Sequence, residues 1–339
     1  MVASTPESDR SSSSTMRVAI GGGLLIVVLL VVVTLFVRGL GSMGSDPSSP
    51  DPRLALGALD EARQWLEAQD PERAERVLAT ALVSFPEDQE LLILLGETLG
   101  LQGKLEESYR AYEQAVLIGP DSAELRFTAG TLANGAGLTQ QALEHFWMAQ
   151  QLDKASPRYP LYLAQIQRKL GQLSEAKASL LRCVNLDEDL HQAWGTLADI
   201  ALQENALTLA RQHVNKARAL DPTSVVYRLL DARIARRENR PEQALQMILS
   251  MGDEVVLSEK SLMDEAALCY GLLQRPGDAA ELYARAVESR PESAPLLYEA
   301  ALWYDRAEED DVALVYARRA ARVGHEGARA LAERLASGE

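Results

Sequence analysis

The stretch "GKLEESYRAYEQAVLIGP", Gly103 to Pro120, decides the fold of this chain because nearly the same phrase returns every 34 residues. It contains a turn residue, acidic residues, small and large apolar residues at helical spacing, and then a helix-breaking end. Its counterparts are "GLTQQALEHFWMAQQLDK" from Gly137, "GQLSEAKASLLRCVNLDE" from Gly171 and "NALTLARQHVNKARALDP" from Asn205. A fixed period of this length is typical of proteins built from stacked structural repeats.

Small residues recur at two positions of this unit when Gln89 is taken as position 1. Such residues let two helices approach closely. Position 20 is Ala74, Ser108, Ala142, Ala176, Ala210 and Ala244, and position 27 is Ala81, Ala115, Ala149, Cys183, Ala217 and Met251.

The residues between these positions indicate a tight turn followed by a second helix. Residues that accept the left-handed conformation at a helix end occupy position 15: Gly103, Gly137, Gly171, Asn205 and Asn239. A proline that can open a helix follows at position 17 in three units, as Pro71, Pro241 and Pro276. Acidic residues such as Glu106, Glu107 and Glu175 then suit the positive end of that helix. Each unit is therefore predicted to be a helix, a turn and an antiparallel helix.

This pattern resembles the tetratricopeptide repeat family, with Leu at position 7, a small residue at 8, Ala at 20, an aromatic residue at 24, Ala at 27 and Pro at 32. The resemblance implies an all-α, right-handed superhelical solenoid of about eight helix hairpins. It spans residues 55–327, as the units 55–88, 89–122, 123–156, 157–190, 191–224, 225–258, 260–293 and 294–327. A capping helix is expected over residues 328–339, because each end of such a stack needs a cover.

Composition agrees with a helical fold. Hydrophobic residues make up 47% of the chain but aromatic residues only 5%, and the excess lies in Ala and Leu, which form helices readily. The formal net charge of -15 argues against binding to nucleic acid, which needs clustered cations. A negative net charge is compatible with a cationic partner.

The N-terminal part predicts a membrane anchor. Residues 1–17 are polar and Ser-rich and are expected to be disordered. Val18 to Val37 carries no charge and is long enough to cross a bilayer as a helix. A cleavable signal peptide is the alternative, but its apolar part is normally shorter. Residues 39–54 form a Gly-, Ser- and Pro-rich flexible linker. We expect a single-pass protein of a bacterial inner membrane, with the array on the periplasmic side.

No arrangement of residues suggests catalysis. Cys183 and Cys269 lie far apart and are expected to be two buried thiols rather than metal ligands or a disulfide. The four histidines fall in different units, and no phosphate-binding loop is present. The sequence therefore predicts a chain that is not an enzyme and that uses no cofactor, metal or small-molecule substrate.

Positions 2, 5, 9, 12 and 13 of the first helix lie opposite the core positions of that helix. In tetratricopeptide proteins they line the concave groove where peptides bind, and we name them the A-helix face. The predicted partner-binding residues are Arg158, Gln165, Arg168, Lys169, Arg233, Arg236 and Arg237. The first three units place Leu59, Ile93, Phe127, Glu90, Glu97 and Asn134 on this face instead. The Arg and Lys residues of the fourth and sixth units would bind an acidic or C-terminal peptide segment. The alternative is that they only solvate the helices and pair with Asp199 and nearby acids.

The predicted function is a membrane-anchored scaffold that binds protein partners during assembly of a membrane or envelope complex. Two alternatives stay open: a structural subunit fixed in a large membrane complex, and a regulatory partner of an enzyme encoded elsewhere. The residues of the family's carboxylate clamp for chaperone C-termini are not found in any three consecutive units.

The sixth unit departs from the pattern, because Arg228 and Asp231 occupy positions 4 and 7, where the family buries apolar side chains. The two could pair with one another at a spacing of three residues. We predict that this unit is the loosest joint of the array, with less hydrogen-exchange protection than the third unit.

Overall fold

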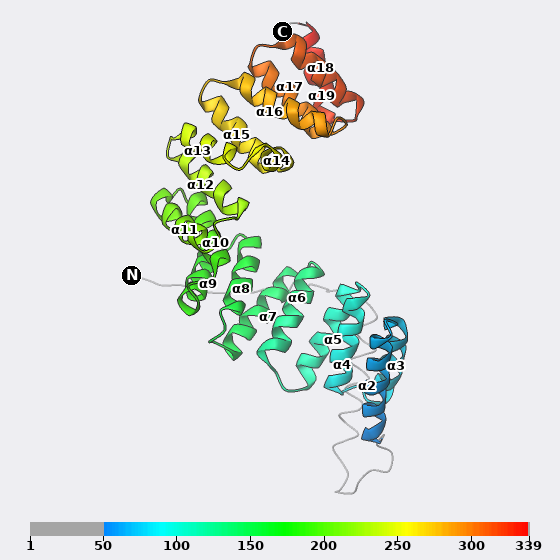
Figure 1. Ribbon diagram of the computed structural model, residues 1–339. Helices are drawn as coiled ribbons and strands as arrows, with labels where there is room; N and C mark the ends of the chain where they lie inside the picture. Colours follow the sequence, from blue (N-terminus) through cyan, green and yellow to red (C-terminus); the bar gives the residue numbers. More distant parts are fainter. Residues whose placement is uncertain (1–50, 338–339) are drawn as a thin grey trace, which may run out of the picture. The chain divides into compact units, whose positions relative to one another are not determined.

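The computed structural model describes residues 51–337, and within this range it contains eighteen helices and no strand (Figure 1). The predicted all-α repeat solenoid is confirmed for this part of the chain. The predicted tail, the predicted span Val18 to Val37 and most of the linker lie outside the described residues. Among the helices within 51–337, none is both long and apolar enough to cross a membrane.

Sixteen of these helices form eight hairpins, one in each 34-residue unit. They are α2 (Pro52–Glu67) with α3 (Pro71–Ser84), α4 (Gln89–Leu101) with α5 (Leu105–Ile118), α6 (Ala123–Gly135) with α7 (Thr139–Leu152), α8 (Arg158–Lys169) with α9 (Leu173–Leu186), α10 (His191–Gln203) with α11 (Leu207–Leu220), α12 (Val225–Arg237) with α13 (Pro241–Leu249), α15 (Lys260–Leu272) with α16 (Pro276–Ser289), and α17 (Ala294–Arg306) with α18 (Asp310–Arg322). Helix α2 begins at Pro52, inside the segment predicted as linker.

Two helices stand outside these pairs. Helix α14 (Asp253–Ser258) follows Gly252, which has a φ of 92°, and it occupies the place where the sequence register slips by one residue. Helix α19 (Glu326–Ser337) packs on α18 and buries Ala328 and Leu331. The helix expected over 328–339 thus starts earlier, at Glu326.

The apolar core is a series of clusters, because each helix packs mainly against the helices that precede and follow it. One cluster joins Leu180 of α9 to Leu197 of α10, and the next joins Val214 of α11 to Ile234 of α12. In such an array, stability is approximately a sum of terms for each repeat and for each contact between neighbours.

Small residues sit where neighbouring helices approach most closely. All six residues at position 20, from Ala74 to Ala244, are fully buried. At position 8, a Cβ built on Gly96 would lie 2.5 Å from the Tyr112 ring, and one on Gly130 would lie 2.9 Å from the Phe146 ring. The aromatic residue at position 24 therefore packs directly on the backbone of the first helix.

The expected left-handed turn is present in every hairpin. Gly103, Gly137, Gly171, Asn205 and Asn239 have φ values between 58° and 81°. Position 15 of the other three units is also left-handed, at Gln69, Gln274 and Glu308. These three residues lack the freedom of glycine, so the packing of the hairpin imposes the conformation on them.

A polar contact between neighbouring units, not predicted from the sequence, recurs at positions 21 and 14. Glu75 accepts a hydrogen bond from Gln102 at 2.8 Å, and Lys177 donates to Glu204 at 2.8 Å. Arg211 donates to Glu238 at 2.6 Å in the same way. In each case the second helix of one unit holds the turn of the next.

The predicted pair between Arg228 and Asp231 is wrong. Asp231 is only 2% exposed and accepts hydrogen bonds from Arg211 and Arg218 of α11. Arg228 donates instead to the Ser250 hydroxyl at 3.2 Å. A carboxylate is thus retained at an apolar position because the preceding unit supplies two guanidinium groups. Reduced protection of the sixth unit stays a prediction.

Replacing Gly96 with Ala should lower the free energy of unfolding by about 1–3 kcal/mol, since the new methyl group would displace the buried Tyr112 ring. The matched control is Gly57, which lies within α2 with nothing near its would-be Cβ. Gly57→Ala should raise stability by roughly 0.5–1 kcal/mol. Urea denaturation of both variants measures this difference, and equal effects would contradict the packing argument.

Removing the partners of Asp231 should cost more than removing Asp231 itself. The double variant Arg211→Met and Arg218→Met leaves a buried carboxylate unpaired and should lose about 3–5 kcal/mol of stability. In Asp231→Leu, the two partly exposed arginines can reach water, so the change should stay within about 1 kcal/mol. Thermal and urea unfolding of both variants measure the two losses of stability. A smaller loss in the double variant than in Asp231→Leu would contradict the importance of this ion-pair network.

Candidate functional site

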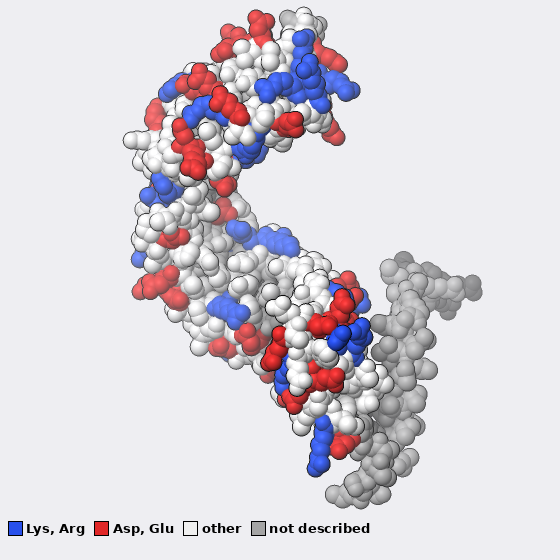
Figure 2. Space-filling model, turned by 45° about the vertical axis from the view of Figure 1, so that its right-hand side comes forward, with Lys and Arg blue, Asp and Glu red and all other residues white. Residues whose placement is uncertain are grey.

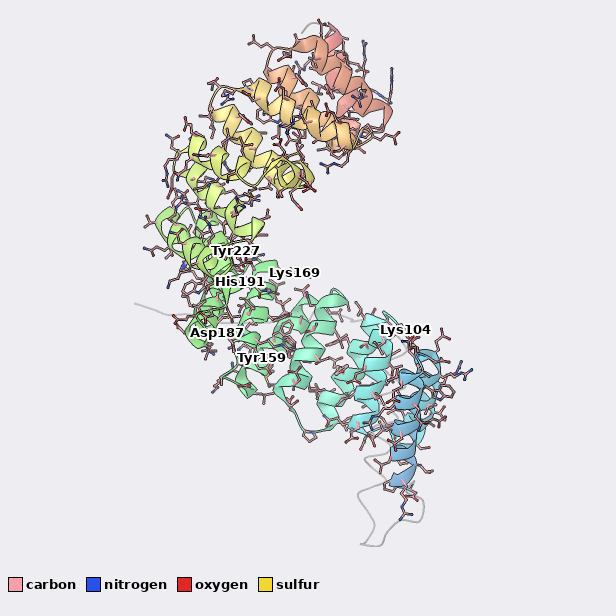
Figure 3. The ribbon with its side chains drawn as sticks, viewed as in Figure 1. Lys104, Tyr159, Lys169, Asp187, His191 and Tyr227 are labelled. Atoms are coloured by element: carbon pink, nitrogen blue, oxygen red, sulfur yellow. The ribbon has the colours of Figure 1, made fainter. Side chains whose placement is uncertain are left out.

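The predicted partner-binding residues come from the first helices of two units. Helix α8 places Arg158, Gln165, Arg168 and Lys169 at the surface, and all four side chains are exposed. Figure 3 labels Lys169 near the C-terminal end of α8. Helix α12 carries the others on its C-terminal half; Arg233 and Arg236 are half-buried and Arg237 is exposed.

Arg158 is held by groups of the preceding unit. One of its guanidinium nitrogens lies 3.1 Å from a carboxylate oxygen of Glu124 on α6. The guanidinium also lies 3.6 Å from the centroid of the Phe127 ring. Such a stack adds cation–π attraction to the ion pair. Arg158 therefore covers an aromatic group of the core.

Arg168 and Lys169 are also bound within the chain. Arg168 donates to Asp199 of α10 at 3.0 Å, and Gln203 donates to the same carboxylate oxygen, also at 3.0 Å. Lys169 donates to the side-chain oxygen of Asn134 at 3.2 Å. The pairing with Asp199 considered as an alternative is thus present for Arg168. The Gln165 side chain makes no hydrogen bond among residues 51–337.

Helix α12 has one arginine that is structural and one that is free. Arg236 binds the carboxylate of Glu265 on α15, which is 4% exposed, and this hydrogen bond raises the pKa of the guanidinium. Arg233 approaches the same carboxylate more loosely, at 3.6 Å. The Arg237 side chain has neither a hydrogen bond nor an ion pair in the part of the chain that the structure describes. The structure therefore separates residues that the sequence pattern grouped together.

The first three units offer less of the predicted face than expected. Leu59 is 2% exposed and Phe127 is 4% exposed, so both belong to the core. Ile93 is partly buried, and Glu90 and Glu97 remain at the surface. Position 5 of the first helix thus turns inward in the first and third units, where a large apolar side chain can reach a neighbouring cluster.

An apolar hollow of about 410 Å³, not predicted from the sequence, lies at the C-terminal ends of α12, α15 and α17. Its apolar walls include Leu268, Leu272 and Trp303, with Arg236 and Arg306 also lining it. Leu268 is 45% exposed and Leu272 is 56% exposed. The sequence feature that could have indicated this hollow is the pair of leucines at positions 9 and 13 of the seventh unit, which belong to the A-helix face.

The two cysteines are free and buried, as predicted. Burial, and then the charge of Asp187, raises the pKa of Cys183 to about 11. Burial likewise raises the pKa of Cys269 to about 12. Neither thiol is suited to act as a nucleophile, because the thiolate is the reactive form. Within residues 51–337, no group of three or more potential ligands is placed to hold a metal ion.

A family model described as tetratricopeptide repeat matches residues 59–123 and 161–225. The presence of tetratricopeptide repeats, predicted from the 34-residue pattern, is thereby confirmed. A search of the curated proteins found no match.

Several solved structures have a similar fold. A tetratricopeptide repeat protein from Parabacteroides merdae is 17% identical, with a TM-score of 0.58, covering 73% of this chain and 98% of that one. PilF from Pseudomonas aeruginosa is 16% identical, with a TM-score of 0.50, covering 64% and 98%. A chain of the Cut9–Hcn1 complex is 14% identical, with a TM-score of 0.51, covering 82% and 55%. At these identities the likeness concerns the fold, and these matches indicate no enzyme relative.

Proposed function

We propose that this chain is a non-catalytic scaffold, tethered to a membrane by Val18 to Val37, that binds an acidic segment of a protein partner on its A-helix face. Tetratricopeptide repeats provide a surface for protein–protein interaction rather than a reaction centre. The observation that carries the proposal is Arg237, an exposed cation without a partner in residues 51–337, beside two further arginines on α12. Arginine binds carboxylates through two parallel hydrogen bonds.

Electrostatics supports an acidic partner at this place. The chain as a whole has a formal charge of -15, yet α12 ends in cations, with Arg233, Arg236 and Arg237 within five residues. A similar cluster lies on α18, where Arg318, Arg319 and Arg322 fall within five residues, and Figure 2 shows Lys and Arg gathered near the C-terminal end of the array. A local cluster of one sign steers an oppositely charged segment toward it.

The membrane tether and its location rest on sequence alone. The uncharged run from Val18 to Val37 has the length of a bilayer-spanning helix. We place the array on the periplasmic side of a bacterial inner membrane, where it would take part in assembling a membrane or envelope complex. Resistance of the full chain to alkaline extraction from membranes, lost when residues 18–37 are deleted, is the expected result.

Reversing two exposed cations of the face should reduce partner capture. The variant combines Lys169→Glu and Arg237→Glu; Arg236 is kept because Glu265 is buried against it. Quantitative mass spectrometry after cross-linking of the tagged full chain in its native membrane should show at least about a tenfold loss of the main partner.

The matched control reverses two exposed arginines on second helices, Arg182→Glu and Arg318→Glu, which changes the charge equally. Equal capture by the two double variants would overturn the proposed face. One stoichiometric assembly among the captured proteins would favour a structural subunit, whereas many weak partners would favour an adaptor. Capture of one enzyme whose activity changes would favour a regulatory partner.

A further inference from the structure

The hollow at the ends of α12, α15 and α17 has the properties of a pocket for a large apolar side chain. Two exposed leucines, Leu268 and Leu272, lie on α15, one helical turn apart. The Trp303 ring of α17 forms the neighbouring wall and packs on Gly271, whose would-be Cβ lies 3.1 Å from it. Trp303 is only 6% exposed, so Leu268 and Leu272 supply the accessible apolar surface of the pocket. Burying that surface under an apolar side chain of a partner would be favourable.

One cation at this pocket is available to a ligand. The guanidinium of Arg306 lies 4.5 Å from the centroid of the Trp303 ring, and no carboxylate among residues 51–337 pairs with it. The adjacent acid, Asp305, is bound by Arg334 at 2.6 Å. Stacking on the indole therefore positions Arg306 at the rim while its N–H groups stay free to donate.

Cations lie on both sides of the apolar pocket. Arg233, Arg236 and Arg237 are on α12, Arg306 is on α17, and α15 with its two leucines comes between these helices in the stack (Figure 1). Two acids near the pocket are engaged: Glu265 by Arg236, and Asp264 by Lys260 at 2.7 Å. Glu308 and Glu309 follow Arg306 in the next turn and are exposed. Among residues 51–337, the cations without a carboxylate partner around this apolar centre are Arg237 and Arg306.

From this geometry we infer that the pocket binds an internal segment of a protein partner in which one large apolar side chain is flanked on both sides by acidic residues. The apolar side chain fills the hollow between Leu268, Leu272 and Trp303. Carboxylates on one side meet Arg306, and those on the other meet Arg237. A single chain-terminal carboxylate would match only one of these cations, so the geometry favours an internal segment. The inference rests on the proposed function and specifies the chemistry of its partner.

The test measures binding of a defined peptide to the full chain in detergent micelles by fluorescence anisotropy. The probe is a fluorescein-labelled peptide, blocked at both ends, with one Phe flanked on each side by three Glu. Arg306→Glu and Leu272→Glu should each raise the Kd at least about tenfold. The matched controls Arg318→Glu and Leu117→Glu change exposed residues on second helices and should leave the Kd within about twofold.

Changes to the peptide test the two halves of the inference separately. Replacing its Phe with Ala, or its Glu residues with Gln, should each weaken binding at least about tenfold. A peptide with neutral side chains and a free C-terminal carboxylate should bind no better than the Gln peptide. Equal affinity of Arg306→Glu and Arg318→Glu for the probe would overturn the inference, as would indifference to the Phe or stronger binding of the free C-terminus.

Folding and the broader proposal are monitored independently. Helical circular dichroism and the unfolding midpoint should match the parent for each variant; the milder Arg306→Gln and Leu272→Gln should still weaken binding about threefold if a reversed charge perturbs the fold. If the native partner is lost on changing Lys169 and Arg237 but the probe does not bind, the scaffold function stands and this inference fails. If the probe binds as described but no native partner depends on the face, the scaffold function fails instead.

Discussion

Close approach of the two helices in each hairpin is the constraint on which this structure depends. It requires a small residue at position 20, as in Ala142, and a residue without a large side chain at position 8, as in Gly130 beneath Phe146. Once the pair is closed, the turn must be left-handed, and even Gln274 and Glu308 adopt that conformation. The remaining apolar surface can then be buried only against the next hairpin, so a linear stack follows.

Much of this architecture could be predicted from the sequence, because it depends on residue size and period. The hairpins, the turns and the buried thiols all follow from local rules. The pairing of Asp231 could not be predicted, since its partners Arg211 and Arg218 come from another helix and are specified by no period. For the same reason the pattern could not tell Arg236, held by a buried acid, from the free Arg237.

The candidate site was predictable in outline and not in detail. The helical period predicts α12 cations on the A-helix face; in the structure Arg233 and Arg236 are half-buried and Arg237 is exposed. The apolar pocket depends instead on how the ends of three successive first helices meet, with Trp303 against Gly271 and Arg306 above the indole. Such a feature arises from tertiary packing between units, so a reading of each unit by itself does not reveal it.

The buried ions at the two borders of the sixth unit restrict how the array can change in evolution. Repeats that share one period can in principle be duplicated, deleted or exchanged, because any apolar border fits any other. This unit is an exception: Asp231 needs the arginines of α11 before it, and Arg236 serves Glu265 of α15 after it. A recombinant that lost the fifth or the seventh unit would leave a charged side chain of the interface without its ion-pair partner. The fifth, sixth and seventh units are therefore expected to be inherited as a block.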